Sequence, residues 1–143
     1  MSKKEKIERV GTMDDSQVST RLLEKNYSPL IVRKYQMKGW PMYIGLICDV
    51  SLSDLDQVVN GVMKKYETEG LIKQDIQAIR NITGLLSDHI IAHYDSIKPG
   101  CVEGVAVLWY VDKTFISSLW GDFMTHMSCK MELYQIINTL PHI

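Results

Sequence analysis

The sequence lacks the short motifs that identify many enzymes and nucleotide-binding proteins. It contains no GxGxxG or GxxxxGK[S/T] loop, no GxSxG nucleophile turn and no CxxC pair. Its glycines are scattered at positions where turns and helix ends are expected. Dinucleotide-binding, P-loop, serine-hydrolase and zinc-knuckle functions are therefore not predicted.

Cysteine is also scarce. The chain has three, Cys48, Cys101 and Cys129, which are odd in number and widely spaced. A disulfide framework is not expected, and unbridged thiols are typical of a reducing compartment. The charged start of the chain is not followed by an apolar segment, so no secretory signal is predicted. No apolar run approaches the roughly 20 residues of a membrane span. These absences predict a cytoplasmic protein that does not enter the membrane.

The composition is that of a folded domain with little net charge. The chain has 143 residues, of which 45% are hydrophobic, and this suffices for one core. A net charge of −1 provides no long-range attraction to nucleic acid. We predict a flexible N-terminal arm at residues 1–13 and a single domain at residues 14–143.

Three short segments, 30–37, 42–50 and 102–111, are rich in β-branched and aromatic residues and have the length of strands. The turn residues at 38–41 predict a hairpin between the first two segments. The near-continuous apolar character of 102–111 indicates a strand covered on both faces.

Helices are predicted at residues 54–67, 72–97 and 115–139, with a short additional helix ending near residue 26. Within the last region, a kink at Gly121 and a division into two helices at Ser128 are both open. In 72–97, apolar positions recur in steps of four and three residues, which is typical of a packed helix. The predicted fold is α+β, with a small, mostly antiparallel sheet of about three strands covered by three or four helices. In the all-α alternative, 42–50 and 102–111 would be buried helices.

Methionines and aromatic residues gather near the C-terminus. Within the predicted helix 115–139, large apolar side chains recur in steps of four and three. Such residues are enriched at protein interfaces, and flexible methionines adapt to a partner. Part of this apolar helix surface would pack against the chain's own sheet. The predicted helices together carry more apolar surface than a small sheet can cover. We predict a partner-binding surface made of Trp120, Phe123, Met124, Met127, Met131 and Tyr134.

Two histidines have the spacing of metal ligands on a helix. His89 and His93 stand four residues apart and would point the same way. A transition metal would need a further ligand, and the candidates are Asp49, Cys101, His126 and Cys129. The pattern lacks the glutamate of HExxH metalloproteases, so hydrogen-bonded histidines in a packed helix are the simpler interpretation.

Two cysteines are candidate nucleophiles. His126 stands three residues before Cys129, and a neighbouring imidazolium would lower the pKa of a thiol. Cys101 follows Pro99 and Gly100, so it could be exposed at the start of a strand. The sequence identifies no third, orienting group, and a buried apolar role explains Cys129 equally well.

Basic and aromatic residues are mixed in segment 33–40, which includes Arg33, Lys34, Lys38 and Trp40. Such segments bind single-stranded nucleic acid through phosphate contacts and stacking. A strand with a solvated basic face is the competing interpretation, and the net negative charge favours it.

The missing motifs and the C-terminal apolar surface favour binding over catalysis. The first hypothesis is a non-catalytic protein-binding module without a cofactor, such as an immunity protein, a secretion chaperone or a small subunit of a complex. Its partner would be another protein or a second copy of the chain. The alternative is a small metal- or thiol-dependent enzyme using His89 and His93, or His126 and Cys129. Nucleic-acid binding through residues 33–40 is a weaker alternative.

Overall fold

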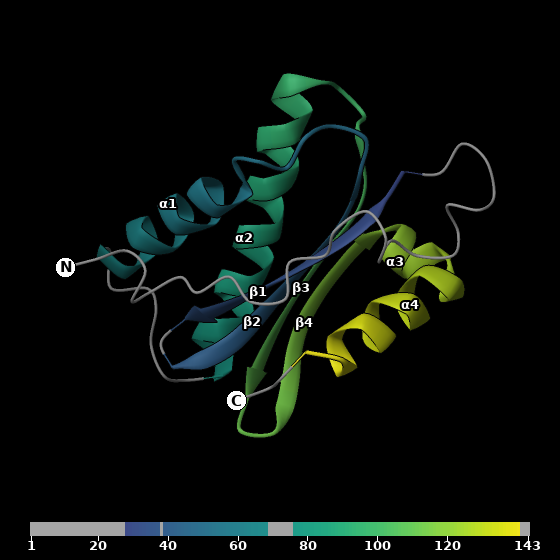
Figure 1. Ribbon diagram of the computed structural model, residues 1–143. Coiled ribbons are helices and arrows are strands. Elements are labelled where there is room, and N and C mark those ends of the chain that lie inside the picture. Colours follow the sequence, from purple (N-terminus) through teal and green to yellow (C-terminus); the bar gives the residue numbers. More distant parts are fainter. Residues whose placement is uncertain (1–27, 38, 69–75, 141–143) are drawn as a thin grey trace.

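A computed structural model of the chain describes residues 28–37, 39–68 and 76–140. The predicted arm at residues 1–13 and the short helix ending near residue 26 lie outside these ranges. The described part holds one antiparallel sheet and helices on both of its faces (Figure 1). The α+β class is therefore confirmed, and the all-α alternative is wrong.

The described elements follow the order ββ-αα-ββ-αα. The strands are β1 (Leu30–Met37), β2 (Trp40–Cys48), β3 (Val102–Val111) and β4 (Thr114–Gly121). The helices are α1 (Leu55–Thr68), α2 (Ile76–Ile97), α3 (Asp122–Thr125) and α4 (Met127–Asn138). The sheet has four strands in the order β1-β2-β3-β4, rather than the predicted three or so.

The β1–β2 hairpin is tighter than the sequence predicts. Met37 pairs with Trp40, so β2 begins two residues earlier than expected. Gly39 adopts a φ of 84°, a left-handed conformation that glycine tolerates best and that lets the chain reverse within this short connection.

Helices α1 and α2 cover one face of the sheet, while α3 and α4 cover the other (Figure 1). Because side chains alternate along a strand, each strand contributes to two hydrophobic clusters. In β2, Ile44 and Leu46 belong to the cluster under α1 and α2, whereas Tyr43 and Ile47 belong to the cluster under α3 and α4. This explains why β2 and β3 are almost continuously apolar, as expected for strands covered on both faces.

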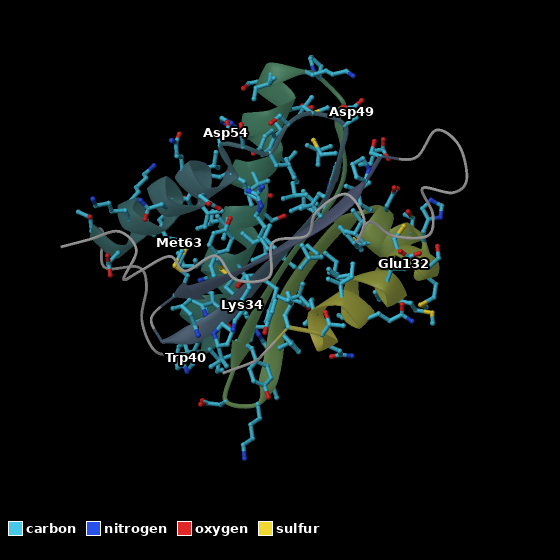
Figure 2. All side chains as sticks on the ribbon, viewed as in Figure 1. Lys34, Trp40, Asp49, Asp54, Met63 and Glu132 are labelled. Carbon is cyan, nitrogen blue, oxygen red and sulfur yellow. The ribbon has the colours of Figure 1, made fainter. Side chains whose placement is uncertain are left out.

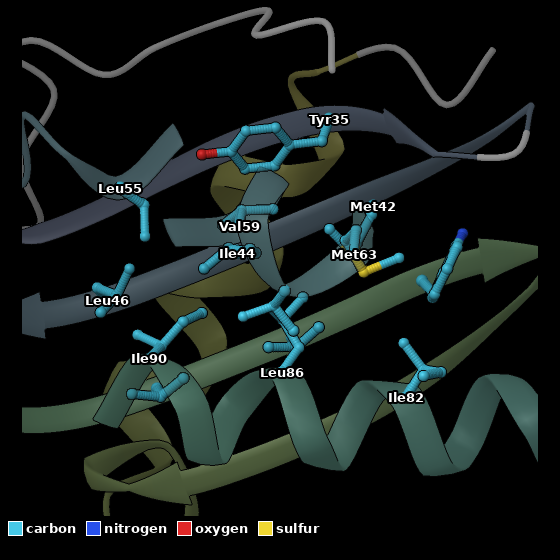
Figure 3. Packing of buried hydrophobic residues seen from close by; sticks show 14 of the residues in the cluster. Tyr35, Met42, Ile44, Leu46, Leu55, Val59, Met63, Ile82, Leu86 and Ile90 are labelled. Atoms are coloured by element: carbon cyan, nitrogen blue, oxygen red, sulfur yellow. The ribbon is translucent and has the colours of Figure 1, made fainter. Parts of the chain in front are cut away.

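The first cluster shows why α2 has its long apolar period. Figure 3 shows Leu86 and Ile90 of α2 facing Ile44 and Leu46 of β2, with Val59 of α1 in the same cluster. All five side chains are buried. The helices predicted at 54–67 and 72–97 are confirmed where the structure describes them, from Leu55 to Thr68 and from Ile76 to Ile97.

The helical region predicted at 115–139 is wrong for residues 115–121 and is confirmed from Asp122 to Thr125 and from Met127 to Asn138. Residues 114–121 form β4, which pairs antiparallel with β3 from Val111 opposite Thr114 onward. Asp112 and Lys113 have φ angles of 49° and 68°, so the two-residue turn between these strands is left-handed. Turns of this kind match the twist of a hairpin, but they are most readily recognised from Asn-Gly or Asp-Gly, which are absent at 112–113. Asp112 and Thr114 were instead consistent with a helix cap.

Helical structure begins after Gly121 and is interrupted once. The extended backbone of His126, with φ −123° and ψ 111°, separates α3 from α4. The sheet allows these helices to approach closely at Gly45 and Gly104. A Cβ atom on Gly45 would lie 2.7 Å from Leu133 Cδ1, and one on Gly104 would lie 3.0 Å from Phe123 Cδ2.

None of the described helices combines the length and the apolar composition that a membrane crossing requires.

Candidate functional site

Helices α3 and α4 carry four large apolar side chains that are exposed. The exposed fractions are 69% for Met124, 66% for Met127, 54% for Met131 and 36% for Tyr134. We call these four residues the methionine face. Met127, Met131 and Tyr134 follow the i, i+4, i+7 spacing and therefore lie along one side of α4.

The opposite side of α4 attaches the helix to the sheet. Cys129, Leu133 and Ile137 are buried in the cluster shared with β1, β2 and β3. The helix is therefore apolar on two sides, of which only one contacts the sheet. The labelled Glu132 marks α4 among the side chains in Figure 2.

Two residues of the predicted partner-binding surface do not lie on the methionine face. Phe123 is fully buried under α3, in the same cluster as Leu133. Trp120 is 41% exposed, but it belongs to β4 and stands opposite Val105, whose side chain faces α1 and α2. Because directly paired residues share a sheet face, Trp120 lies on the other side of the sheet from α4. The apparent continuous period from Trp120 to Tyr134 combined a strand with two helices.

His89 and His93 each have a partner on the α1 side of α2. The His89 Nε2 atom lies 2.9 Å from the hydroxyl of Tyr66, which belongs to α1. The His93 Nε2 atom lies 2.6 Å from Oδ2 of Asp54, the residue before α1. The predicted spacing along one side of a helix is observed, and the two imidazoles connect α2 to opposite ends of α1.

Asp54 is the centre of a polar cluster that the sequence did not reveal. Its second carboxylate oxygen accepts a 2.7 Å hydrogen bond from the Tyr94 hydroxyl. Partial burial acts to raise the pKa of Asp54, but the hydrogen bonds from Tyr94 and His93 outweigh it and hold that pKa below 3.8. Burial, followed by the bond to the Asp54 carboxylate, raises the pKa of Tyr94 far above 10.0. Asp54 is labelled in Figure 2 near the start of α1.

The ligands considered for a metal are dispersed. Asp49 forms a 2.8 Å ion pair with Lys98, and the Cys101 thiol donates to the Tyr94 carbonyl at 3.3 Å. His126 and Cys129 belong to the α3–α4 side of the sheet. Across residues 28–37, 39–68 and 76–140, no group of three or more His, Cys, Asp or Glu side chains is arranged to hold a metal ion.

The candidate nucleophiles are shielded from solvent. Cys129 is 1% exposed and faces the sheet, whereas His126 is exposed and lies 3.8 Å from Asp122. Cys101 is 2% exposed, so the predicted exposed position after Pro99 and Gly100 is wrong. The backbone N–H of Cys101 donates to the Lys98 carbonyl, and the Cys101 side chain lies in the core.

The basic strand is buried rather than solvated. Arg33 and Lys34 are only 9% and 2% exposed. One Arg33 nitrogen donates to the Leu52 carbonyl at 2.9 Å and lies 3.8 Å from Asp56. Trp40 packs against the first cluster (labelled in Figure 2), while Lys38 lies outside the described residues. The described residues of this segment present no basic surface to nucleic acid.

Comparison of the chain with protein-family models, with curated proteins and with solved structures finds no match.

Proposed function

We propose that the protein is a non-catalytic module that binds one protein partner through the methionine face. The supporting observation is the exposure of Met124, Met127, Met131 and Tyr134 on helices whose other side already packs against the sheet. Exposure of apolar side chains to water is unfavourable, and their burial against another apolar surface lowers the free energy.

The methionine face suits an adaptable contact. Methionine side chains are flexible and polarizable, so they fill an irregular partner surface without a preformed pocket. Tyr134 adds a rigid ring with a hydroxyl that can remain at the edge of the interface. A row of exposed apolar side chains along a helix can enter an apolar groove or pack against an amphipathic helix of the partner.

Several contacts weigh against the alternative of a metal- or thiol-dependent enzyme. The imidazoles of His89 and His93 bond to Tyr66 and Asp54, and Cys129 is buried against the sheet. The proposed location is the cytoplasm, since three cysteines that are odd in number and widely spaced are typical of a reducing compartment. A neutralising, chaperone or scaffolding role is compatible with this proposal.

The test compares two variants with equal added charge on the same helix. Met127→Glu with Met131→Glu places two carboxylates on the methionine face. Ser128→Glu with Gln135→Glu places two at exposed positions beside it. The partner is captured with the wild-type chain from a native extract, identified, purified, and titrated by calorimetry. If each methionine contributes about 2 kcal/mol, the first variant weakens binding by roughly a thousandfold.

The control variant should bind the partner as the wild type does, and circular dichroism should be unchanged for both. Equal affinity of the methionine variant and the wild type would contradict the proposal. Sedimentation analysis tests whether the chain instead associates with a second copy of itself. Self-association that the Met127→Glu, Met131→Glu variant abolishes would assign the face to a second copy of the chain instead of another protein.

A further inference from the structure

Cys48 and Cys101 bring two thiols together at one end of the first hydrophobic cluster. Their sulfur atoms lie 3.7 Å apart, although the residues are separated by 53 positions in the sequence. Each residue is only 2% exposed. Cys48 ends β2 and stands opposite Val102, so the antiparallel pairing of β2 with β3 places Cys101 beside it.

The two segments that carry the thiols are held together by further contacts. Asp49 follows Cys48 and forms a 2.8 Å ion pair with Lys98, which lies at the end of α2. The Lys98 carbonyl accepts the Cys101 backbone N–H at 3.1 Å. Asp49 is labelled near this end of the sheet in Figure 2. The sulfurs therefore remain neighbours without a covalent bond.

We propose that Cys48 and Cys101 form a redox site, which closes to a disulfide when hydrogen peroxide oxidises it. The proposal does not depend on the methionine face, because that face belongs to α3 and α4 on the opposite side of the sheet. A sulfur–sulfur bond is about 2 Å long, so the two sulfurs, now 3.7 Å apart, need to approach by less than about 2 Å.

The first attack is assigned to Cys101. The Cys48 thiol directs its hydrogen toward the Cys101 sulfur at 3.7 Å, and burial raises the pKa of Cys48 to about 11. Cys101 directly follows the turn of residues 98–100, all of which are exposed.

The reaction balances in two steps. The Cys101 sulfur attacks one oxygen of hydrogen peroxide, the O–O bond breaks, and the departing oxygen leaves as water with the thiol proton. Cys101 is then a sulfenic acid. The Cys48 sulfur attacks the Cys101 sulfur, the S–O bond breaks, and the hydroxyl leaves as a second water with the Cys48 proton. In total, the thiols lose two electrons and the peroxide is reduced to two waters.

The disulfide would also remove one contact at the end of α2. In the thiol form, Cys101 Sγ donates to the Tyr94 carbonyl at 3.3 Å. A disulfide sulfur has no hydrogen to donate, so the carbonyl keeps only the 3.0 Å bond from the Lys98 N–H. Oxidation therefore acts on the same turn of α2 that bonds to Asp54.

The experiment treats the folded full chain with hydrogen peroxide, removes the peroxide, unfolds the chain in denaturant and then alkylates the remaining thiols. We expect the number of titratable thiols to fall from three to one, and the intact mass before alkylation to fall by two hydrogen atoms. Peptide mapping should identify a Cys48–Cys101 cross-link that dithiothreitol reverses.

Three variants complete the test. Cys129→Ser should still form the cross-link, because Cys129 lies in the other cluster, whereas Cys48→Ser and Cys101→Ser should not. If either of the latter fails to fold by circular dichroism, the peptide map of the wild-type chain decides. Three titratable thiols after peroxide treatment, or a cross-link that includes Cys129, would overturn the proposal.

Discussion

The single carboxylate of Asp54 joins α2 to the start of α1. Its oxygens bond to His93 and Tyr94, which lie 39 and 40 residues further along the chain. In the sequence, the same residue is fully explained as a negative charge near a helix N-terminus. The sequence predicts that Asp54 stands at the start of a helix. Its hydrogen-bond partners depend on how α2 crosses α1, and no local sequence pattern encodes that crossing.

The first prediction concerns the charge of Asp54. Asp54→Asn should lower the free energy of unfolding by about 1–2 kcal/mol near neutral pH, because two hydrogen bonds to a charged acceptor are weakened. The pKa of Asp54 is lowered by folding, so this stabilisation is present above its unfolded value of 3.8. It is lost as the pH falls through the lower, folded value.

Urea unfolding of the wild type and Asp54→Asn at about pH 7 and about pH 3 measures this difference. Asp88→Asn is the control, because Asp88 is exposed on α2, the helix that carries His93 and Tyr94. A difference between the wild type and Asp54→Asn that persists unchanged at the lower pH would contradict the assigned role of the charge.

Among the secondary-structure elements, β4 departs most from the sequence-based prediction. Residues 114–121 have helix-compatible spacing when considered alone, and their polar and apolar positions do not alternate clearly. Pairing with β3 provides the backbone hydrogen bonds that make this segment a strand. The prediction of the partner-binding surface was affected in the same way, since Met127, Met131 and Tyr134 share a helix face but Trp120 does not.

Gly121 marks the junction between β4 and α3, and the second prediction is made there. Its φ of 68° and ψ of −131° are unfavourable for any other residue, and an added Cβ would lie 2.2 Å from the Glu103 carbonyl oxygen. Gly121→Ala should therefore destabilise the protein by at least about 2 kcal/mol, as measured by urea unfolding.

Gly61→Ala is the matched control, because Gly61 lies within α1 and an added Cβ would meet no atom within 4 Å. Alanine is the better helix former, so this variant should gain up to about 1 kcal/mol. Equal stability of the two variants would show that Gly121 does not constrain the junction.

The molecule as a whole consists of two hydrophobic clusters that share one sheet. Leu86 of α2 is buried in the first cluster and Leu133 of α4 in the second, and both contact a sheet whose strands contribute to both clusters. Since neither helix layer has a sheet of its own, we expect the described part of the chain to unfold as one unit.

Leu86→Ala and Leu133→Ala test this expectation. Each should lower the free energy of unfolding by about 2–5 kcal/mol, because a buried leucine is truncated. Circular dichroism and tryptophan fluorescence should still report one shared transition. The exposed substitution Gln135→Ala should leave that transition nearly unchanged. Separate loss of helical signal in Leu133→Ala, before the main transition, would indicate that α4 is an independent unit.

The sequence by itself determined the elements whose own periodicity is strong. These are β1, β3, α1 and the described part of α2, because each carries an apolar pattern that fits one regular structure. Tertiary structure decided the conformation of residues 114–121, the burial of Phe123, Arg33 and Lys34, and the meeting of Cys48 with Cys101. These features depend on strand pairing and on which layer covers each side chain, and both arise between segments that are distant in the chain.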